Sequence, residues 1–225
     1  MSHTSQRRGL DPSRPGEELI VQAMITRAFM KKEGIGKAMN ELAAKMLEQG
    51  RDHWPQWTVE DLEALANGPA QEGVAAVFTD MKRVENLLND LKREWLPRNR
   101  EKGYPVSIVL TGLTRDIQDL CRKTGFKQHT YLHSLGAFGR VEDLPSGDEL
   151  SLVTMCGHGL VATNRVRDLV KRIKKGETTP EEAAADIAAP CGCGISNKKR
   201  AQELFKRLGS GLGGDHVAGD KSGAL

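Results

Sequence analysis

Residues 105–112 read PVSIVLTG, and this stretch decides the fold class that the sequence predicts. Val106–Leu110 is a continuous apolar run of β-prone residues after a proline, which is typical of a buried strand. Before it, apolar residues recur at three- and four-residue spacing, which indicates helices. After it, strand-like and helix-like segments alternate. The sequence therefore predicts an α/β protein with a helical N-terminal region followed by a small α/β unit.

Apolar stripes define the helices of the N-terminal region. Leu19–Phe29 and Met39–Met46 carry the first two, and the second is expected to stop at Gly50. A short capped helix is expected from Thr58. A long helix is predicted to begin at Pro69 and to bury this stripe: Val74, Val77, Phe78, Met81, Val84, Leu88 and Leu91. Three tryptophans are expected to close the end of the bundle: Trp54, Trp57 and Trp95.

In the α/β unit, a helix is predicted from Thr114, and further strands are expected over Lys127–Leu135 and Leu150–Met155. Three more helices are predicted: one ending at Gly176, one beginning at the capping box Thr179–Glu182, and one over Ser196–Leu208.

These elements divide the chain into a flexible arm at 1–16, a helical region at 17–100, an α/β metal-site region at 104–208 and a glycine-rich tail at 209–225. With 38% hydrophobic and 28% charged residues, the 225-residue chain is typical of a core-forming protein. A net charge of +3 is too small to indicate nucleic-acid binding, which requires a concentrated basic face. No apolar run reaches the roughly 20 residues of a membrane helix, and residues 1–16 lack a secretory signal, so we expect a cytoplasmic protein.

Two glycine-rich segments carry the residues that are expected to do chemistry. They are Met155-Cys156-Gly157-His158-Gly159 and Pro190-Cys191-Gly192-Cys193-Gly194. Disulfides rarely persist in the cytosol, and thiolate with imidazole is a ligand set for zinc and for iron–sulfur clusters. The predicted metal ligands are Cys156, His158, Cys191 and Cys193. Four glycines are candidate cofactor-binding residues, because they let backbone amides approach the centre: Gly157, Gly159, Gly192 and Gly194.

The spacing of these ligands bears on the cofactor. Cys-x-His and Cys-x-Cys are tighter than the Cys-x2-4-Cys of zinc knuckles, which favours an iron–sulfur cluster (4Fe-4S) over zinc. Three cysteines would leave one iron for His158, for Cys121 or for a small substrate. This predicts an iron–sulfur enzyme that acts on a small molecule or in sulfur or redox chemistry, with Cys156 and His158 as catalytic residues. A zinc-stabilised module whose N-terminal helices bind a protein partner is an alternative.

The same two segments resemble the catalytic motifs of the proline racemase and hydroxyproline epimerase family, with Cys193 where threonine is usual. In that family one cysteine removes a proton from the substrate α-carbon as thiolate, and the other delivers a proton to the opposite face. The resemblance implies that Cys156 and Cys191 form such a pair in a cofactor-free isomerase or lyase. It covers ten residues, and only 34 residues separate the two cysteines, so it implies chemistry and not a fold.

The remaining candidates have plainer roles. Cys121 fits the apolar face of a helix, and His129 and His133 share one face of either a strand or a helix, where a packing or surface role is expected. The loop Cys156–Gly159 precedes a helix and would also suit an anion. The sequence has no phosphate-loop or dinucleotide-binding motif.

Overall fold

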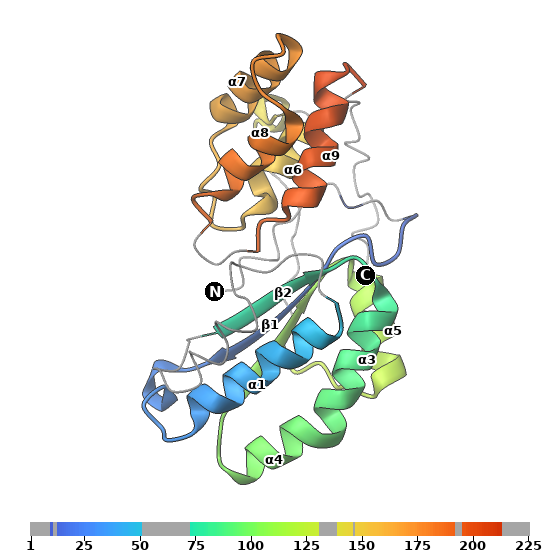
Figure 1. Ribbon diagram of the computed structural model, residues 1–225. Coiled ribbons are helices and arrows are strands. Elements are labelled where there is room, and N and C mark those ends of the chain that lie inside the picture. Colours follow the sequence, from blue (N-terminus) through green and yellow to red (C-terminus); the bar gives the residue numbers. More distant parts are fainter. Residues whose placement is uncertain are drawn as a thin grey trace. The chain divides into compact units, whose positions relative to one another are not determined.

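The computed structural model describes residue 10 and residues 13–50, 73–130, 139–145, 147–191 and 195–212. The chain divides into two compact units, one formed by residues 11–129 and the other by residues 130–225 with 1–10 (Figure 1). The predicted mixed α/β class is confirmed by helices together with an antiparallel sheet. Within the described ranges, no helix combines the length and the apolar character that a membrane crossing needs.

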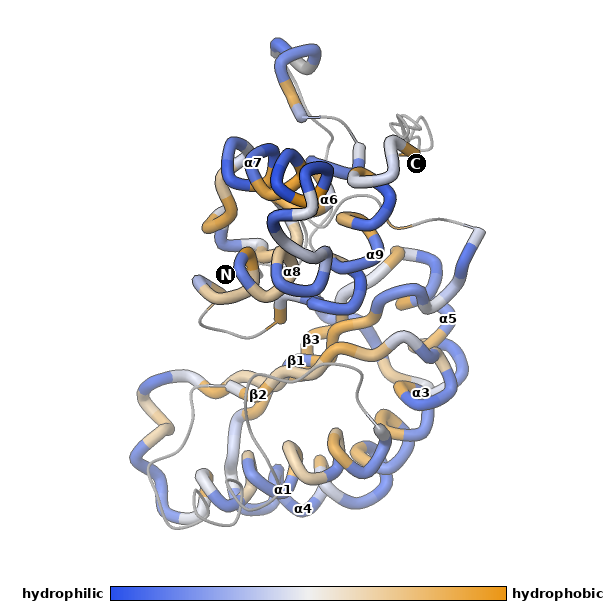
Figure 2. The backbone as a smooth tube through the Cα atoms, turned by 45° about the horizontal axis from the view of Figure 1, so that its top comes forward, coloured by the Kyte–Doolittle hydropathy of each residue, from blue (hydrophilic) through white to orange (hydrophobic). Residues whose placement is uncertain are grey.

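The N-terminal unit is organised around the strand β1 (Leu19–Ile25). In the described sheet, β1 lies between β2 (Gly73–Phe78) and β3 (Val106–Thr111) and is antiparallel to both. Helices α1 and α3 lie along one face of the sheet (Figure 1). Figure 2 shows the strands as a hydrophobic band of the chain. A central strand with a neighbour on each side has its backbone groups paired along both edges.

Helices contribute more described residues to this unit than strands do: α1 (Ile35–Glu48), α3 (Met81–Asp90), α4 (Leu96–Glu101) and α5 (Thr114–Thr124), with a 3₁₀ turn at Arg27–Phe29 and a π-helical turn at Leu91–Trp95. The sheet face that meets α1 and α3 belongs to one apolar core. Trp95 is fully buried in it, and its Nε1 donates to the carbonyl of Ala38 at 3.2 Å. This bond ties the π-helical turn to α1.

The described part of the C-terminal unit is helical: a 3₁₀ turn at Val141–Asp143, α6 (Gly147–Met155), α7 (Thr163–Lys174), α8 (Pro180–Ala188) and α9 (Lys198–Gly209). The predicted capping box is present, since Thr179 Oγ1 accepts from the Glu182 amide at 3.1 Å and Glu182 Oε2 accepts from the Thr179 amide at 2.9 Å. The predicted stop at Gly176 is confirmed by its left-handed φ of 72°.

The helix predicted over residues 19–29 is wrong for its first seven residues, which form β1. The segment is apolar on both faces because β1 is central, and six of its seven residues are buried. A strand buried on both faces lacks the alternation that would distinguish it from a helix.

The long helix predicted from Pro69 is wrong over Val74–Phe78, which forms β2. The helix begins at Met81, where the side chain of Asp80 caps it by accepting from the amides of Lys82 and Arg83 at 2.7 and 3.3 Å. Asp80 was the signal that separates the two elements, because aspartate is a favoured N-cap residue.

The strand predicted over Leu150–Met155 is also wrong, because these residues belong to α6. Ser151 and Thr154 donate their hydroxyls to the carbonyls of Gly147 and Leu150, each at 2.8 Å. These bonds to the preceding turn suit a helix and cannot form in a strand.

The other expected elements have mixed outcomes. The strand over Val106–Leu110 and the helices predicted over Met39–Met46, from Thr114 and over Ser196–Leu208 are confirmed by β3, α1, α5 and α9. The strand predicted over Lys127–Leu135 is wrong for residues 127–130, which form neither strand nor helix, and its residues 131–135 lie outside the described residues. The helix at Thr58, Trp54, Trp57 and most of the arm and the tail also lie outside them. At the end of the predicted arm, Gly16 donates its amide to Asp116 Oδ2 at 2.8 Å.

Leu88 tests the core of the N-terminal unit. Its side chain is 1% exposed in the core cluster, so Leu88→Ala should lower the free energy of unfolding by about 2–5 kcal/mol, as expected for a buried leucine. Urea unfolding followed by circular dichroism measures the change. The control is Leu212→Ala, because Leu212 is 76% exposed. Equal effects of the two changes would contradict the assignment of Leu88 to the core.

Candidate functional site

The first motif lies where α6 ends. Cys156 follows the last residue of α6 and is fully buried, and the amide of Gly159 donates to the carbonyl of Cys156 at 2.9 Å to close a turn. Gly159 takes a φ of 68°, a left-handed conformation that favours glycine. His158 is exposed within this turn, and its Nδ1 lies 3.7 Å from Cys156 Sγ. The structure thus brings together two of the predicted site residues.

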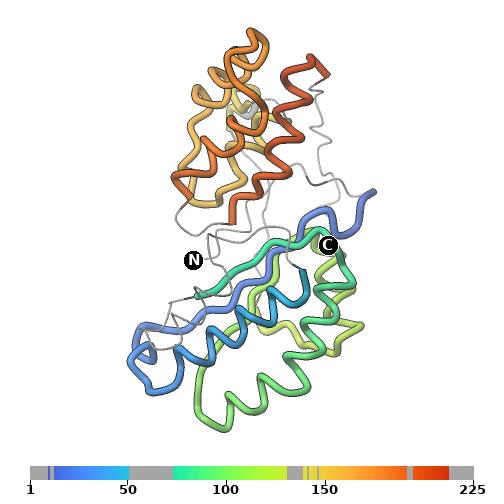
Figure 3. Tube along the Cα trace, in the orientation of Figure 1, coloured from blue at the N-terminus to red at the C-terminus, as the bar shows by residue number. Residues whose placement is uncertain are grey.

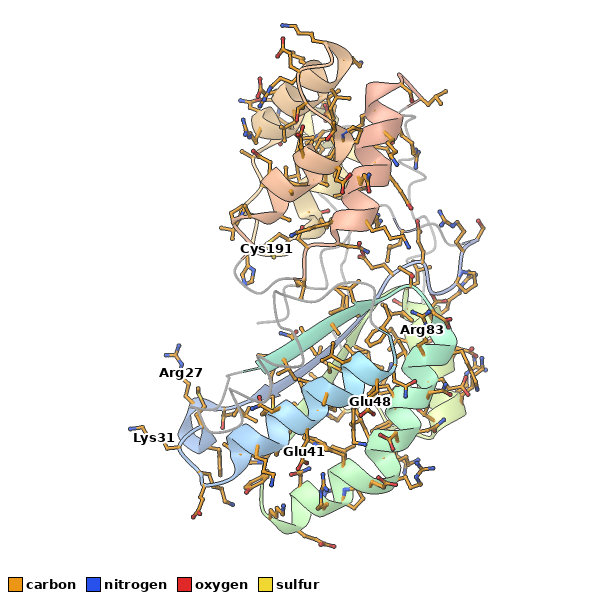
Figure 4. The ribbon with its side chains drawn as sticks, in the orientation of Figure 1. Arg27, Lys31, Glu41, Glu48, Arg83 and Cys191 are labelled. Carbon is orange, nitrogen blue, oxygen red and sulfur yellow. The ribbon has the colours of Figure 1, made fainter. Side chains whose placement is uncertain are left out.

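The second motif follows α8. Cys191 is 7% exposed, and its amide donates to the carbonyl of Ala188 at 3.0 Å, which ends the helix. Figure 4 shows Cys191 at the end of the helical unit where α8 stops. Gly192, Cys193 and Gly194 lie outside the described residues, so the expected roles of these three remain predictions.

Ion pairs show which helix ends lie together. Arg207 near the end of α9 pairs with Asp148 at the start of α6 at 3.3 Å, which places the end of α9 by the start of α6. Arg165 in the first turn of α7 makes a two-pronged pair with Asp186 near the end of α8, with Nε donating to Oδ1 at 2.9 Å. The chain also reverses between α8 and α9 (Figure 3).

The ends of α6 and α8 and the starts of α7 and α9 therefore lie at one end of the helical unit. We call this the cysteine end and define it by residues 155–162, 187–191 and 195–200. Cys156, His158 and Cys191 all belong to it.

A pocket of about 310 Å³ lies at the cysteine end. One side is lined by Leu160, Val161 and Ala162, which follow the Cys156 turn directly. The other side includes Ile187 and Pro190, and Pro190 precedes Cys191 directly. Chain segments adjoining both motifs thus line one pocket, although the motifs are more than 30 residues apart in the sequence.

The pocket also contains the ion pair of Arg165 and Asp186. The guanidinium lowers the pKa of Asp186, chiefly by its hydrogen bonds to the carboxylate. Sequence reasoning missed this pair, because its members lie 21 residues apart with no motif around either.

The segment that leads into α9 is buried. Ile195, Ser196 and Asn197 are no more than 1% exposed, and Arg200 is 6% exposed. Asn197 caps α9, since its Oδ1 accepts from the amide of Arg200 at 3.1 Å. Lys198 and Lys199, which begin α9, are exposed.

The other candidate residues do not join this end. Cys121 belongs to α5 in the N-terminal unit, where partial burial raises the pKa of its thiol. His129 is exposed beyond α5, and His133 lies outside the described residues. In the parts of the chain that are described, no three or more His, Cys, Asp or Glu side chains are close enough to hold a metal ion.

Comparisons with protein-family models, with curated proteins and with solved structures find no match to this chain.

Removing the ion pair of Arg165 with Asp186 should change the titration of the Asp186 carboxyl group. Arg165→Met removes the hydrogen bonds that lower the pKa of Asp186, so this pKa should rise toward its ordinary value of about 3.9. A lowered carboxyl pKa stabilises the folded state above the unfolded-state pKa, and this stabilisation is lost as the pH falls through the folded-state pKa. Wild type and variant should therefore differ in stability at neutral pH and converge in acid.

Carboxyl-resolved NMR titration measures the pKa of Asp186, and urea unfolding at neutral and acid pH measures the stability. Arg140→Met is the matched control, because Arg140 pairs with Asp143 and not with Asp186. An unchanged Asp186 titration in Arg165→Met would exclude the pair.

Proposed function

We propose that this chain is a metal-binding protein whose cysteine end holds the metal with Cys156, Cys191, Cys193 and His158. The observation that carries the proposal is the pocket lined from both sides by segments adjoining the two motifs. Within the described residues, Cys156, His158 and Cys191 do not form a group that could hold a metal ion. The proposal therefore depends on Cys193, which is two residues beyond Cys191 in the sequence.

The separation of Cys156 and His158 favours zinc. Ligand distances of about 2.3 Å for sulfur and 2.05 Å for nitrogen place two ligands of one tetrahedral ion about 3.6 Å apart. The Sγ and Nδ1 atoms are 3.7 Å apart, which suits a shared single ion. On a four-iron cluster, a cysteine and a histidine bind different irons and lie farther apart. An iron–sulfur centre would therefore use the three cysteines and leave this position of His158 unexplained.

A zinc ion with three thiolates and one imidazole has no open position, so its role is structural. The helical unit is small, and small units are commonly stabilised by a metal. Its buried apolar side chains include four alanines beside larger ones such as Leu152, Leu169 and Phe205. In this proposal, zinc clamps the helix ends of a cytosolic protein-interaction module, and its cysteines remain out of disulfides.

A second candidate is the cofactor-free acid/base pair Cys156 and Cys191. The contact between Cys156 Sγ and His158 Nδ1 favours it, because an imidazole in hydrogen-bonding range accepts the thiol proton and leaves the reactive thiolate. The pocket of about 310 Å³ would receive a small substrate. In this candidate Cys193 is dispensable, which distinguishes it from the metal centre.

Metal analysis after anaerobic purification tests both candidates. Wild type should contain one zinc per chain, and Cys193→Ser should lose it, because the serine hydroxyl is a poor ligand for a thiophilic metal. Cys121→Ser is the control and should keep its zinc, since Cys121 lies in the other unit. An absorption band at about 400 nm would show that the bound cofactor is an iron–sulfur cluster and not zinc. Metal-free wild type, or zinc retained by Cys193→Ser, would contradict the zinc proposal.

Alkylation mapped by mass spectrometry gives a second readout on the same protein. Metal should protect Cys156, Cys191 and Cys193 from alkylation, and a chelator should expose them. Cys121 serves as the internal reference. Its raised pKa makes it slow to react, and its rate should not change with metal. Equal rates at Cys156 with and without metal would exclude it as a ligand.

A further inference from the structure

The pocket at the cysteine end combines an apolar lining with an ion pair. Its volume is about 310 Å³, and it is lined by these apolar residues: Leu160, Val161, Ala162, Ile187 and Pro190. Arg165 and Asp186 complete the lining. Sites that bind ligands typically have this composition, in which apolar side chains supply the contact area and a few polar groups fix the orientation of the ligand.

Leu160 extends the apolar lining of this pocket to the surface. Its side chain is 51% exposed, whereas Val161, the next residue, is 5% exposed. A single exposed leucine is common and needs no explanation by itself. Leu144 in the same unit is such a residue, because it is 45% exposed and does not line the pocket. Leu160 differs from it in adjoining a cavity that an apolar group can enter.

The ion pair determines the charge of a matching ligand. Among the described residues, Arg165 donates to Asp186 through Nε and Nη2 and to Asp168 through Nη1. A guanidinium has five N–H groups and a carboxylate has about four acceptor positions, so these bonds leave a donor and an acceptor for a ligand. Arg165, and further Arg172, lower the pKa of Asp186. Asp186, and further Asp168, raise the pKa of Arg165. Two cations and two anions therefore lie together, and the pair offers a donor beside an acceptor with little net charge.

We propose that the pocket is the docking site for a short peptide segment of a protein partner, which inserts an apolar side chain and places its own peptide group on the pair of Arg165 with Asp186. A peptide group carries one donor, one acceptor and no charge, which complements this ion pair. An apolar side chain that fills a pocket is the usual anchor of a protein interface. The inference rests on the interaction role proposed above and not on the metal.

Small peptide analogues test the docking site on the full-length protein. N-acetyl-leucine N-methylamide carries a leucine side chain between two peptide groups and has no charge. A ligand of this size should bind with a Kd of about 1 mM. Titration followed by ¹H–¹⁵N NMR should give saturable shifts of the backbone amides of residues 160–162 and 187. The glycine analogue lacks the apolar side chain and should bind about 10-fold more weakly. N-acetyl-leucine, an anion, and leucine N-methylamide, a cation, should also bind more weakly than the neutral probe.

Two variants test the two parts of the pocket separately. Leu160→Ala removes apolar contact area and should weaken binding of the neutral probe about 3- to 10-fold. Leu144→Ala is the matched control, since Leu144 is similarly exposed outside the pocket, and it should bind as wild type does. Arg165→Met leaves the charge of Asp186 without its partner. This variant should therefore prefer the cationic leucine N-methylamide to the neutral probe, a reversal that a loss of packing would not produce.

Each outcome decides the proposal. Absence of saturable shifts at residues 160–162 and 187 overturns the docking site. Tighter binding of N-acetyl-leucine than of the neutral probe would make the pocket an anion site and overturns it as well. Equal weakening by Leu160→Ala and Leu144→Ala does the same. Zinc content is measured on the same samples. Metal-free protein that binds the neutral probe removes the metal centre and supports the docking site, whereas zinc-loaded protein that does not bind the probe overturns the docking site alone.

Discussion

The pairing of β1 on both edges is the constraint from which the N-terminal unit follows. A central strand must be buried on both faces, and β1 meets this requirement with six buried residues out of seven. One of its faces meets α1 and α3. Trp95 is buried in the same core, and its Nε1 donates a hydrogen bond to the carbonyl of Ala38 in α1. Large apolar side chains thus provide the stability of this unit.

The C-terminal unit combines a buried apolar interior with polar links between helices. Its helices bury large apolar side chains, among them Leu152, Leu169 and Phe205. Arg165 also pairs with Asp186, and an exposed ion pair of this kind contributes little to stability. The pair nevertheless marks where the start of α7 meets the end of α8, beside the segments that carry the two cysteine motifs.

The sequence singled out Cys156 and His158 by their spacing in a glycine-rich loop, and the structure places the two side chains 3.7 Å apart. Their expected role as metal ligands stays a prediction. β1 and β2 were taken for helices, since hydrophobic periodicity cannot separate a short, fully buried strand from a helix. Residues 150–155, LSLVTM, show the opposite error, because a strand was predicted and a helix is found. The hydroxyls of Ser151 and Thr154 bond to the preceding helical turn, and a pattern of apolar residues cannot reveal such bonds. The pair of Arg165 with Asp186 depends on a long-range contact, which no local motif encodes.

In the proposed metal centre, His158 would distinguish a closed zinc site from an open centre. The thiol of Cys156 is fully buried, whereas the His158 ring 3.7 Å away is exposed. As the fourth ligand of zinc, the ring would close the centre against both water and substrate. Without a bond to metal, the ring would leave a cluster or a thiolate open. The 3.7 Å separation from Cys156 suits the closed form, and a zinc ion held there would clamp the helix ends that meet at the cysteine end.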